Sequence, residues 1–595
     1  MTVTDPITAE VIRGAMETVA YEMTVHVSQT AKTPILNQSN ELNASIIDWR
    51  GRLAAVSVGV PQLMLASLGP VQYAIEFFGD DIHEGDIIVG NDPYHGGGHL
   101  PDYNVFAPVV VDGEVVLFAS IQCHHADTGG GVPGGYNAEA EDIWAEGVRW
   151  PTVKLADRGV ERRDLIYAMQ CNTRATTFIG DLRAQMGAVK LGVQRLKAMI
   201  ERYGVELVKA AVQHSIDHTA KRVASVIESW PDGVYEADSY VDADPVGNAD
   251  IHVHATVTVS GDRIAVDFTG SDMRQDLKAY STLGNTRGYV ICQLGAMMDP
   301  SIPKNDGFFD VIDIHAPQGS CVNPHPGMTV AAGIHHPGVE VGEVVCKALA
   351  KFLPERAAPQ IYKVGTPCVL TGRHPDTGDL FFDHAVDSLS GYCSAVKGVD
   401  GWGCYPASFG NIIRATTEIN ESIFPFRNEY LDFETDSGGA GQWRGGLGSR
   451  VVKRFLAPVT LNTWVVGVKY PMPGFEGGRD GSPNKLTVRF DTNNPVAIDC
   501  MAKGEVHRNG DAFEYYYGGG GGFGDPLKRD PTAVLEDVLD EYVSMDSALN
   551  DYGVVLEGSL HEYDLRVNIQ ATRERRIELA SLVENTDVQA VGEAL

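Results

Sequence analysis

The sequence is poor in basic residues. It has 47 Lys and Arg residues against 79 Asp and Glu residues, which gives a formal net charge of −32 at pH 7. An excess of negative charge on this scale repels the phosphates of nucleic acids and the anionic headgroups of membranes. We therefore expect neither nucleic acid nor a membrane surface as a partner.

Long apolar runs and paired cysteines are also missing. No segment has the ~18 consecutive apolar residues of a membrane-spanning helix, and the N-terminus has no basic stretch followed by an apolar one. These absences favour a cytoplasmic location. The nine cysteines include no Cys-x-x-Cys pair, which argues against a zinc ribbon or a thioredoxin-like motif. Their odd number is typical of reduced thiols.

A phosphate-binding loop is the third absence. The sequence contains no Gly-x-x-x-x-Gly-Lys-Ser/Thr motif, in which backbone amides and a lysine hold nucleotide phosphates. The most glycine-rich segment, residues 518–524, has no lysine that could reach a phosphate, so we interpret it as a tight turn. We expect no nucleotide-binding site on this chain.

The length and the turn-forming residues predict several lobes. At roughly 150 residues per domain, 595 residues suggest about four structural units. The 65 glycines and 30 prolines indicate many turns and loops rather than a helical bundle. We predict a multi-lobed α+β fold with a mixed N-terminal half and a β-rich C-terminal half. The expected units are residues 1–230, 231–353, 354–530 and 531–595.

Local patterns predict the main elements. Apolar residues recur at helical spacing after Asp5 and Pro6, which can cap and start a helix. Alternating residues around Asp112-Gly113 predict a β-hairpin with strands 104–111 and 114–122. The other expected elements are a hairpin over 44–56, a helix over 66–78 interrupted at Gly69-Pro70, a helical region over 182–228 broken at Gly204, a hairpin over 252–268, a helix over 339–352 and a helix over 531–549.

Potential metal ligands gather around the first of these hairpins. They are His95, His99, Asp102, His124, His125 and Asp127. Antiparallel pairing about the Asp112-Gly113 turn would place residue 101 opposite residue 124, so side chains from the preceding loop and from the end of the hairpin would meet. We therefore predict a metal site formed by His99, Asp102 and His124.

The chemistry of this ligand set narrows the choice of metal. Imidazole nitrogen and carboxylate oxygen together suit Zn, Mn or Fe rather than a soft metal. Asp127 is a candidate fourth ligand or a partner that orients an imidazole. His95 and His125 are weaker candidates as ligands, because their neighbours already occupy the expected positions. Cys123, next to His124, points to the opposite strand face and is predicted to be a packed thiol.

Two further histidine pairs stand out. His335 and His336 lie between glycines, with two glutamates close behind, which favours a role in substrate or proton handling. His252 and His254 alternate on one face of a strand, which is typical of a solvated or intersubunit surface. The predicted catalytic residues are His125, Asp127, His335 and His336.

Several motifs carry a family resemblance. They are Asp5-Pro-Ile-Thr8, Glu10-Val-Ile-Arg13, Asn91-Asp-Pro-Tyr94, Gly97-Gly-His99 with Asp102, Asp267-Phe-Thr-Gly-Ser271, Asp436-Ser-Gly-Gly-Ala-Gly441, Arg444-Gly-Gly446, residues 519–526 and Tyr552-Gly-Val554. In the order and spacing of these motifs, over residues 5–555, the chain resembles the hydantoinase B/oxoprolinase family, which includes the large subunits of acetone and acetophenone carboxylases. In the manganese-dependent carboxylases of this family the matching residues ligate the metal, which implies that role for His99, Asp102 and His124.

The resemblance implies a division of labour between subunits. Family members generally work with a hydantoinase A-like subunit, which binds ATP and Mg²⁺ and phosphorylates an amide or enolate oxygen. The metal-binding subunit would then activate water or position carbon dioxide. The compact length favours hydrolysis of a cyclic amide such as a hydantoin, a lactam or oxoproline. ATP-dependent carboxylation of a ketone is one alternative, and a structural subunit whose metal only stabilises the fold is another.

The chain departs from the family pattern at two places. Where members usually carry an Arg-Thr-Ala motif and acidic residues, it has Gln29-Thr-Ala31 and residues 37–43. Where they carry Gly-Asn-Val-Glu-Thr, it has residues 333–338. Loops of this kind set specificity while the scaffold is shared. The resemblance therefore does not imply one particular substrate.

Overall fold

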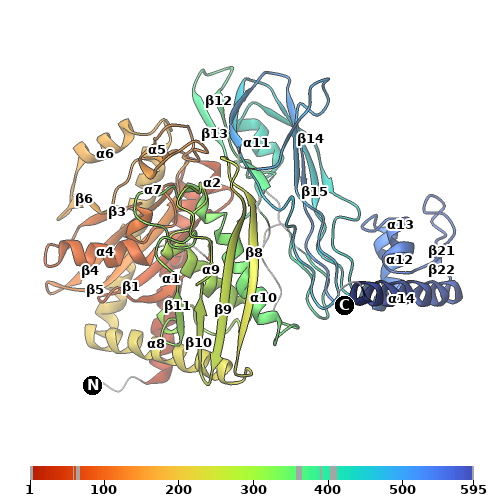
Figure 1. Cartoon of the computed structure of the whole chain (residues 1–595). Helices are drawn as coiled ribbons and strands as arrows, with labels where there is room; N and C mark the ends of the chain where they lie inside the picture. The colour runs from red at the N-terminus through yellow and green to blue at the C-terminus, as the bar shows by residue number, and fades with distance from the viewer. Residues whose placement is uncertain are drawn as a thin grey trace.

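The computed structural model describes residues 5–57, 59–61, 67–356, 363, 365–388, 392–402, 410, 412–500 and 502–592. Figure 1 shows the chain passing from a seven-stranded sheet through a four-stranded sheet to two further large sheets, and ending in helix α14 (Ile569–Gly592). The mixture of helices and mainly antiparallel sheets confirms the predicted fold class. The C-terminal half is rich in strands, as predicted.

The first layer is a seven-stranded sheet that is buried on both faces. Alternate residues of its central strands face two different cores: Val105 and Ala119 face long helices, whereas Phe106 and Phe118 face a short helix and the second sheet. The elements of this layer are α1 (Pro6–Thr30), α2 (Pro34–Asn37), β1 (Leu42–Asp48), β2 (Leu53–Val56), α4 (Leu68–Phe78), β3 (Ile87–Gly90), η1 (Pro93–His95), β4 (Asp102–Val111), β5 (Glu114–His124), α5 (Ile143–Glu146), β6 (Val153–Asp157), β7 (Val160–Glu161), α6 (Arg163–Cys171), α7 (Phe178–Tyr203) and α8 (Val205–Glu228).

The helix boundaries in this layer follow local rules. Asp5 accepts a hydrogen bond from the Thr8 amide at 3.0 Å, so α1 begins where the sequence predicts. Gly204, with φ of 82°, separates α7 from α8, as predicted. The interruption expected at Gly69-Pro70 is wrong. Both residues lie in the first turn of α4, where proline removes no helical hydrogen bond.

The β4–β5 hairpin positions the candidate site. The two strands turn at Asp112 and Gly113, as predicted, but their register shifts at a bulge between Val109 and Val110. The extra residue of a bulge moves the pairing beyond it by one position. Asp102 therefore lies directly opposite His124, and the predicted pairing of residue 101 with residue 124 is wrong by one residue.

The second layer is a four-stranded sheet with order β11-β10-β9-β8. Helix α10 packs on one face of β8 and β9, and the other face is open to solvent. Strand β8 is not among the expected elements, because the residues it turns inward are mostly small or polar, such as Ala237 and Ser239. The elements are β8 (Gly233–Ala243), β9 (Ala249–Ser260), β10 (Arg263–Asp267), α9 (Leu283–Ala296), η2 (Asp306–Phe308), β11 (Ile312–His315), η3 (Ala331–Ile334) and α10 (Gly338–Ala350).

The C-terminal half contains two packed sheets, with orders β13-β12-β16-β19 and β14-β15-β20-β17-β18. Leu370 and Leu461 of one sheet share a core with Val451 and Phe513 of the other. The elements are β12 (Gly365–Arg373), β13 (Leu380–Asp383), α11 (Thr417–Ile423), β14 (Phe426–Phe433), β15 (Ser449–Phe455), β16 (Val459–Val465), β17 (Lys485–Val488), β18 (Val496–Ile498), β19 (Ala502–His507), β20 (Ala512–Tyr517) and η4 (Pro526–Lys528).

Glycine-rich segments of this half pack against each other. Gly439 donates to the carbonyl of Gly520 at 2.9 Å, and Gly520 donates to the carbonyl of Gly446 at 2.8 Å. A Cβ atom at Gly445 would overlap the carbonyl of Gly520. The absence of side chains is therefore what allows these two backbones to touch.

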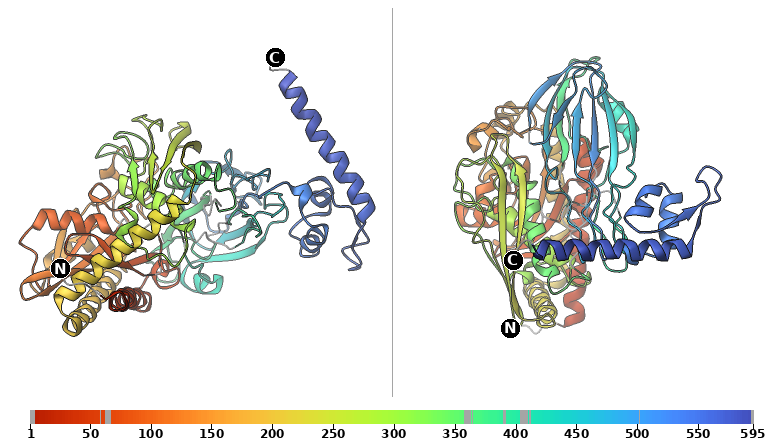
Figure 2. Two further views of the ribbon diagram at one scale, coloured as in Figure 1. Left: turned by 90° about the horizontal axis from the view of Figure 1, so that it is seen from below. Right: turned by 45° about the vertical axis from the view of Figure 1, so that its right-hand side comes forward.

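The chain ends in a small helical group. The single helix predicted over 531–549 is two helices, α12 (Pro531–Leu539) and α13 (Met545–Asn550), because Glu541 between them has φ of 59°. A short pair of strands, β21 (Leu556–Glu557) and β22 (Arg566–Val567), leads to α14, which extends away from the other layers (Figure 2). In the part of the chain that the structure describes, no helix has both the length and the apolar character that crossing a membrane requires.

A buried lysine lies between two carboxylates in the C-terminal core. Lys453 has no exposed surface, and its ammonium group lies 2.7 Å from Asp387 Oδ1 and 3.6 Å from Asp383 Oδ2. Burial alone would lower the pKa of Lys453, but the two carboxylates outweigh it and raise that pKa above its ordinary value. The ammonium group is therefore charged inside the core.

Lys453→Met is expected to destabilise the fold by about 3–5 kcal/mol, because it leaves buried carboxylates without their cation. Lys485→Met, on strand β17 of the same sheet and exposed, is the matched control and is expected to change stability little. Urea unfolding followed by fluorescence measures both. Equal midpoints for the two variants would show that the buried ion pairs do not hold this core.

Candidate metal centre

Three predicted ligands meet at the end of the β4–β5 hairpin. Asp102 is the first residue of β4, His124 is the last residue of β5, and His99 lies in the loop just before β4. One ligand atom from each residue lies within 4.8 Å of the others, and each residue is at most 1% exposed. The hairpin thus brings two imidazoles and a carboxylate together in a site closed to solvent.

Hydrogen bonds fix one imidazole of the cluster. His99 Nδ1 lies 2.7 Å from Asp102 Oδ2, and the Tyr136 hydroxyl lies 3.0 Å from His99 Nε2. His124 Nδ1 lies 3.6 Å from Asp102 Oδ1 and 3.4 Å from Glu41 Oε1. Burial alone would raise the pKa of Asp102, but His99 and His124 outweigh it and hold that pKa well below its usual value. The carboxylate is therefore ionised.

Several polar atoms of the cluster lack a hydrogen bond. Asp102 Oδ1 and both ring nitrogens of His124 have no hydrogen-bond partner among the described residues. A buried polar atom left in this state costs about 1–3 kcal/mol, and an ionised carboxylate costs more. A cation between these atoms would remove that cost. The donor set of imidazole and carboxylate fits Zn, Mn or Fe.

Three residues that the sequence motifs do not indicate also contact the cluster: Glu41, Tyr136 and His384. The His384 ring lies 5.3 Å from the His124 ring, and its Nε2 has no hydrogen-bond partner in the described structure. Burial raises the pKa of Glu41 above its ordinary value. Glu41 falls in residues 37–43, the segment named above as a departure from the family's acidic pattern, yet it is itself acidic, and this is the signal that could identify it. His384 follows β13 in the C-terminal half, and no local pattern links it to the hairpin.

His335 and His336 point to different surroundings. The His335 ring lies 6.0 Å from Tyr136 and 6.3 Å from Trp464, on the border of the cluster. Burial lowers the pKa of His335 well below its ordinary value, so the ring is neutral. His336 instead contacts Glu340, with Nδ1 2.9 Å from Oε2. Of the two predicted residues, only His335 is placed beside the candidate ligands.

His125 and Asp127 lie outside the cluster. His125 faces the opposite side of the sheet, where its Nε2 lies 2.8 Å from Gln185 Oε1 and its ring packs on Tyr103. Asp127 accepts hydrogen bonds from the amides of Gly134 and Arg174, at 2.9 and 2.6 Å. These contacts indicate that His125 and Asp127 hold neighbouring loops and helices in place. A catalytic role for either residue stays a prediction.

His95 and Cys123, the two other residues considered near the hairpin, also lie outside the cluster. His95 lies in η1, where its Nδ1 is 3.1 Å from Asp92 and its ring packs at a tilt against Tyr73, so it is turned away from the cluster. Cys123 is fully buried in the core on the opposite face of β5 from His124. Burial raises the pKa of Cys123 well above its ordinary value, as expected for a packed thiol.

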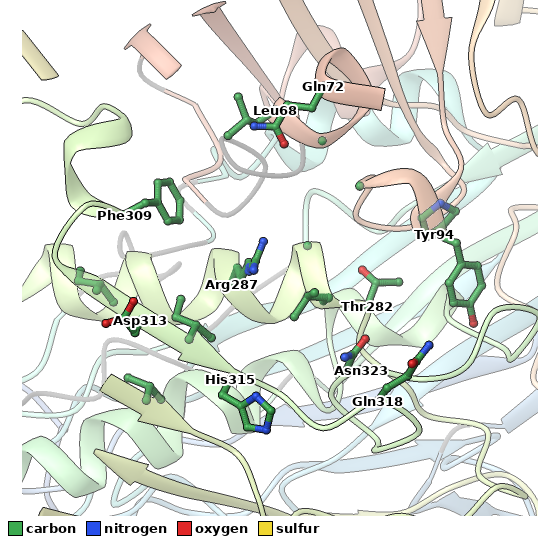
Figure 3. Close-up of a pocket in the computed structure, with 18 of the residues that line it drawn as sticks. Leu68, Gln72, Tyr94, Thr282, Arg287, Phe309, Asp313, His315, Gln318 and Asn323 are labelled. Atoms are coloured by element: carbon green, nitrogen blue, oxygen red, sulfur yellow. The ribbon is translucent and has the colours of Figure 1, made fainter. Parts of the chain in front are cut away.

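An open cleft of about 850 Å³ lies beside the loop that carries His99. Tyr94 and Gly96 form part of its wall, and the Thr282 hydroxyl on another wall donates to the carbonyl of Gly97 at 3.3 Å. Figure 3 shows Arg287, on α9, pointing into this cleft. None of the three candidate ligands is among the described residues that line it. The cleft and the buried cluster are thus separate features, and the loop before β4 contributes residues to both.

Known proteins resemble this chain over most of its length and in its fold. The family described as hydantoinase B/oxoprolinase matches residues 5–526. The caprolactamase subunit beta of Pseudomonas jessenii is 31% identical, over 94% of this chain and 97% of its own length. The delta subunit of acetophenone carboxylase from Aromatoleum aromaticum is 26% identical, over 83% of this chain and 78% of its own length. The crystal structure of the ATP-dependent caprolactamase from Pseudomonas jessenii superposes with a TM-score of 0.88 at 28% identity, over 97% of this chain and 100% of that one. The chain therefore belongs to the hydantoinase B/oxoprolinase family.

Proposed function

We propose that this chain is the metal-binding subunit of an ATP-dependent complex that hydrolyses a cyclic amide. The observation that carries the proposal is the buried set of His99, Asp102 and His124. One ligand atom from each residue lies within 4.8 Å of the others, and among the described residues Asp102 Oδ1 and both ring nitrogens of His124 have no hydrogen-bond partner. The similarity to a caprolactamase subunit along nearly the whole chain supports a lactam or a related ring as the substrate class.

The residues of the cluster would share the work of binding and orientation. His99, Asp102 and His124 would hold the metal, and Tyr136 would fix the orientation of His99. When bound, a divalent metal supplies Lewis acidity that lowers the pKa of a water molecule and polarises an oxygen of the substrate. His335 offers a neutral imidazole next to the cluster and would accept a proton from the attacking water.

ATP and Mg²⁺ would act on a hydantoinase A-like partner subunit. The sequence has no phosphate-binding motif, which supports activation elsewhere in the complex. A phosphorylated amide reacts readily with bulk water, so a closed path from the partner to the metal centre is expected. The burial of all three candidate ligands fits such a closed path.

Carboxylation of a ketone is the second candidate function. The acetophenone carboxylase delta subunit is similar to this chain, although it is less identical and less completely covered than the caprolactamase subunit. A metal centre of the same composition could position carbon dioxide rather than activate water. In the remaining alternative the metal only stabilises the fold.

His124→Ala and Asp102→Ala are expected to abolish metal binding, because each removes one of three ligands from a site with few others. The purified wild-type chain should contain about one Zn, Mn or Fe ion. Emission spectroscopy of the purified proteins measures the metal content, and thermal unfolding shows whether each variant folds.

His125→Ala is the matched control for this test. It removes the imidazole of the next residue, which follows the end of β5 and faces the other side of the sheet, and should leave the metal content unchanged. The metal assignment is wrong if wild-type metal content persists in both ligand variants, or if His125→Ala lowers it as much as His124→Ala.

The chain purified together with an ATP-binding partner is expected to open a cyclic amide in an ATP-dependent reaction, whereas the chain alone should neither bind ATP nor form product. Caprolactam, hydantoin and 5-oxoproline are suitable test substrates. His124→Ala should lower product formation by more than about 100-fold. Removing a residue that only hydrogen-bonds a metal ligand lowers activity by about 10- to 100-fold, and loss of the ligand itself should cost more.

Separate readouts distinguish the three functions. Chromatography of the ring-opened product reports hydrolysis, and incorporation of labelled bicarbonate into a ketone reports carboxylation. Carboxylation without hydrolysis would replace the proposed reaction with the second candidate. Full activity of a folded His124→Ala complex that has lost its metal would support a structural metal instead.

A further inference from the structure

A second group of potential ligands lies on the solvent face of the four-stranded sheet. Strand β8 supplies Asp238, and strand β9 supplies His252 and His254. Asp238 pairs directly with His254 across the two strands, and His252 is two residues away on the same face of β9. The sequence pattern indicates only the two histidines. The pairing of β8 with β9 brings the Asp238 carboxylate next to them.

The three side chains converge on one point. His252 Nε2 lies 2.6 Å from Asp238 Oδ1, and His254 Nδ1 lies 2.9 Å from the same oxygen. All three ligand atoms lie within 4.8 Å of one another. Two ligands bonded to zinc at about 2.1 Å lie about 3.4 Å apart at a tetrahedral angle. Small movements of these side chains would therefore create the spacing that a metal requires.

Neighbouring residues hold both imidazoles in place. The ring of Tyr240 stacks on His252 with centroids 4.9 Å apart, and Tyr470 stacks on Tyr240 at 5.1 Å. The Thr256 hydroxyl lies 3.3 Å from His254 Nε2. If Nδ1 of His254 binds a metal, its hydrogen moves to Nε2 and can be donated to Thr256. Metal-binding histidines commonly have a partner of this kind on the other nitrogen.

The electrostatic surroundings favour a cation. The half-exposed Asp238 carboxylate lies beside both imidazoles, where its charge can attract a cation. Lys347 donates to the backbone carbonyl of Asp238 and is paired with Glu343. Lys469 is likewise paired with Asp250 at 2.6 Å. Lys347, which reaches the strand from α10, and Lys469 are thus each paired with a carboxylate.

We propose that Asp238, His252 and His254 form a second binding site for a divalent transition metal of the zinc class. The side chains are 50%, 31% and 19% exposed, respectively, so one side of the site is open to water or to a further ligand. Three protein ligands with an open position are also the arrangement of many zinc sites that bind water or substrate. The site lies on a different sheet from the buried cluster and is independent of the function proposed for that cluster.

The test is a calorimetric titration of ZnCl₂ into the full chain that already carries the metal with which it was purified. Wild-type protein is expected to bind about one further zinc ion at the open site. His252→Ala and His254→Ala should lose this uptake. Thr256→Val keeps the three ligands but removes the hydroxyl partner of His254, and should weaken zinc binding by about 10-fold.

His561→Ala is the control, because His561 is exposed and lies outside every described ligand group. It should bind zinc as the wild type does. His214 and His218 stack one turn apart on α8 and could also bind zinc, so His214→Ala is measured in parallel. Unchanged zinc uptake by folded His254→Ala, or loss of uptake in His214→Ala instead, would overturn the proposal.

Discussion

The pairing of β4 with β5 through their outermost residues is the constraint on which the candidate metal centre depends. It places Asp102 directly opposite His124, while the loop before β4 returns His99 to the same carboxylate. The bulge at Val109 and Val110 sets this register. Without that shift, side-chain alternation would turn one of the two paired residues toward the opposite face of the sheet.

The rest of the chain closes around this hairpin end. Tyr136 comes from the loop after β5, His335 from the segment before α10, and His384 and Trp464 from the C-terminal sheets. Residues from three regions of the sequence thus exclude water from one carboxylate and two imidazoles. In such a site electrostatic interactions are stronger than in water, which suits both tight metal binding and protection of a reactive intermediate.

Local patterns in the sequence predict the elements but not every contact between them. The Asp112-Gly113 turn, the cap at Asp5 and the break at Gly204 each follow from one or two residues, so they could be predicted. No residue in the sequence signals the bulge at Val109 and Val110, so the predicted register of β4 against β5 differs from the observed one by one residue. His384 and Asp238 reach their histidine partners only through packing of distant segments or pairing of separate strands. Such long-range contacts are not encoded in local periodicity.

The central claim is that His99, Asp102 and His124 bind one metal together. Anomalous scattering from a crystal of the metal-loaded complex tests it most directly, because data collected on either side of the metal absorption edge locate the ion without reference to activity. The account predicts that the anomalous peak marks a metal ion bonded to all three residues at distances of about 2.0–2.2 Å. A fully loaded crystal whose anomalous peak lies elsewhere, with these three side chains bonded only to protein atoms, would contradict it.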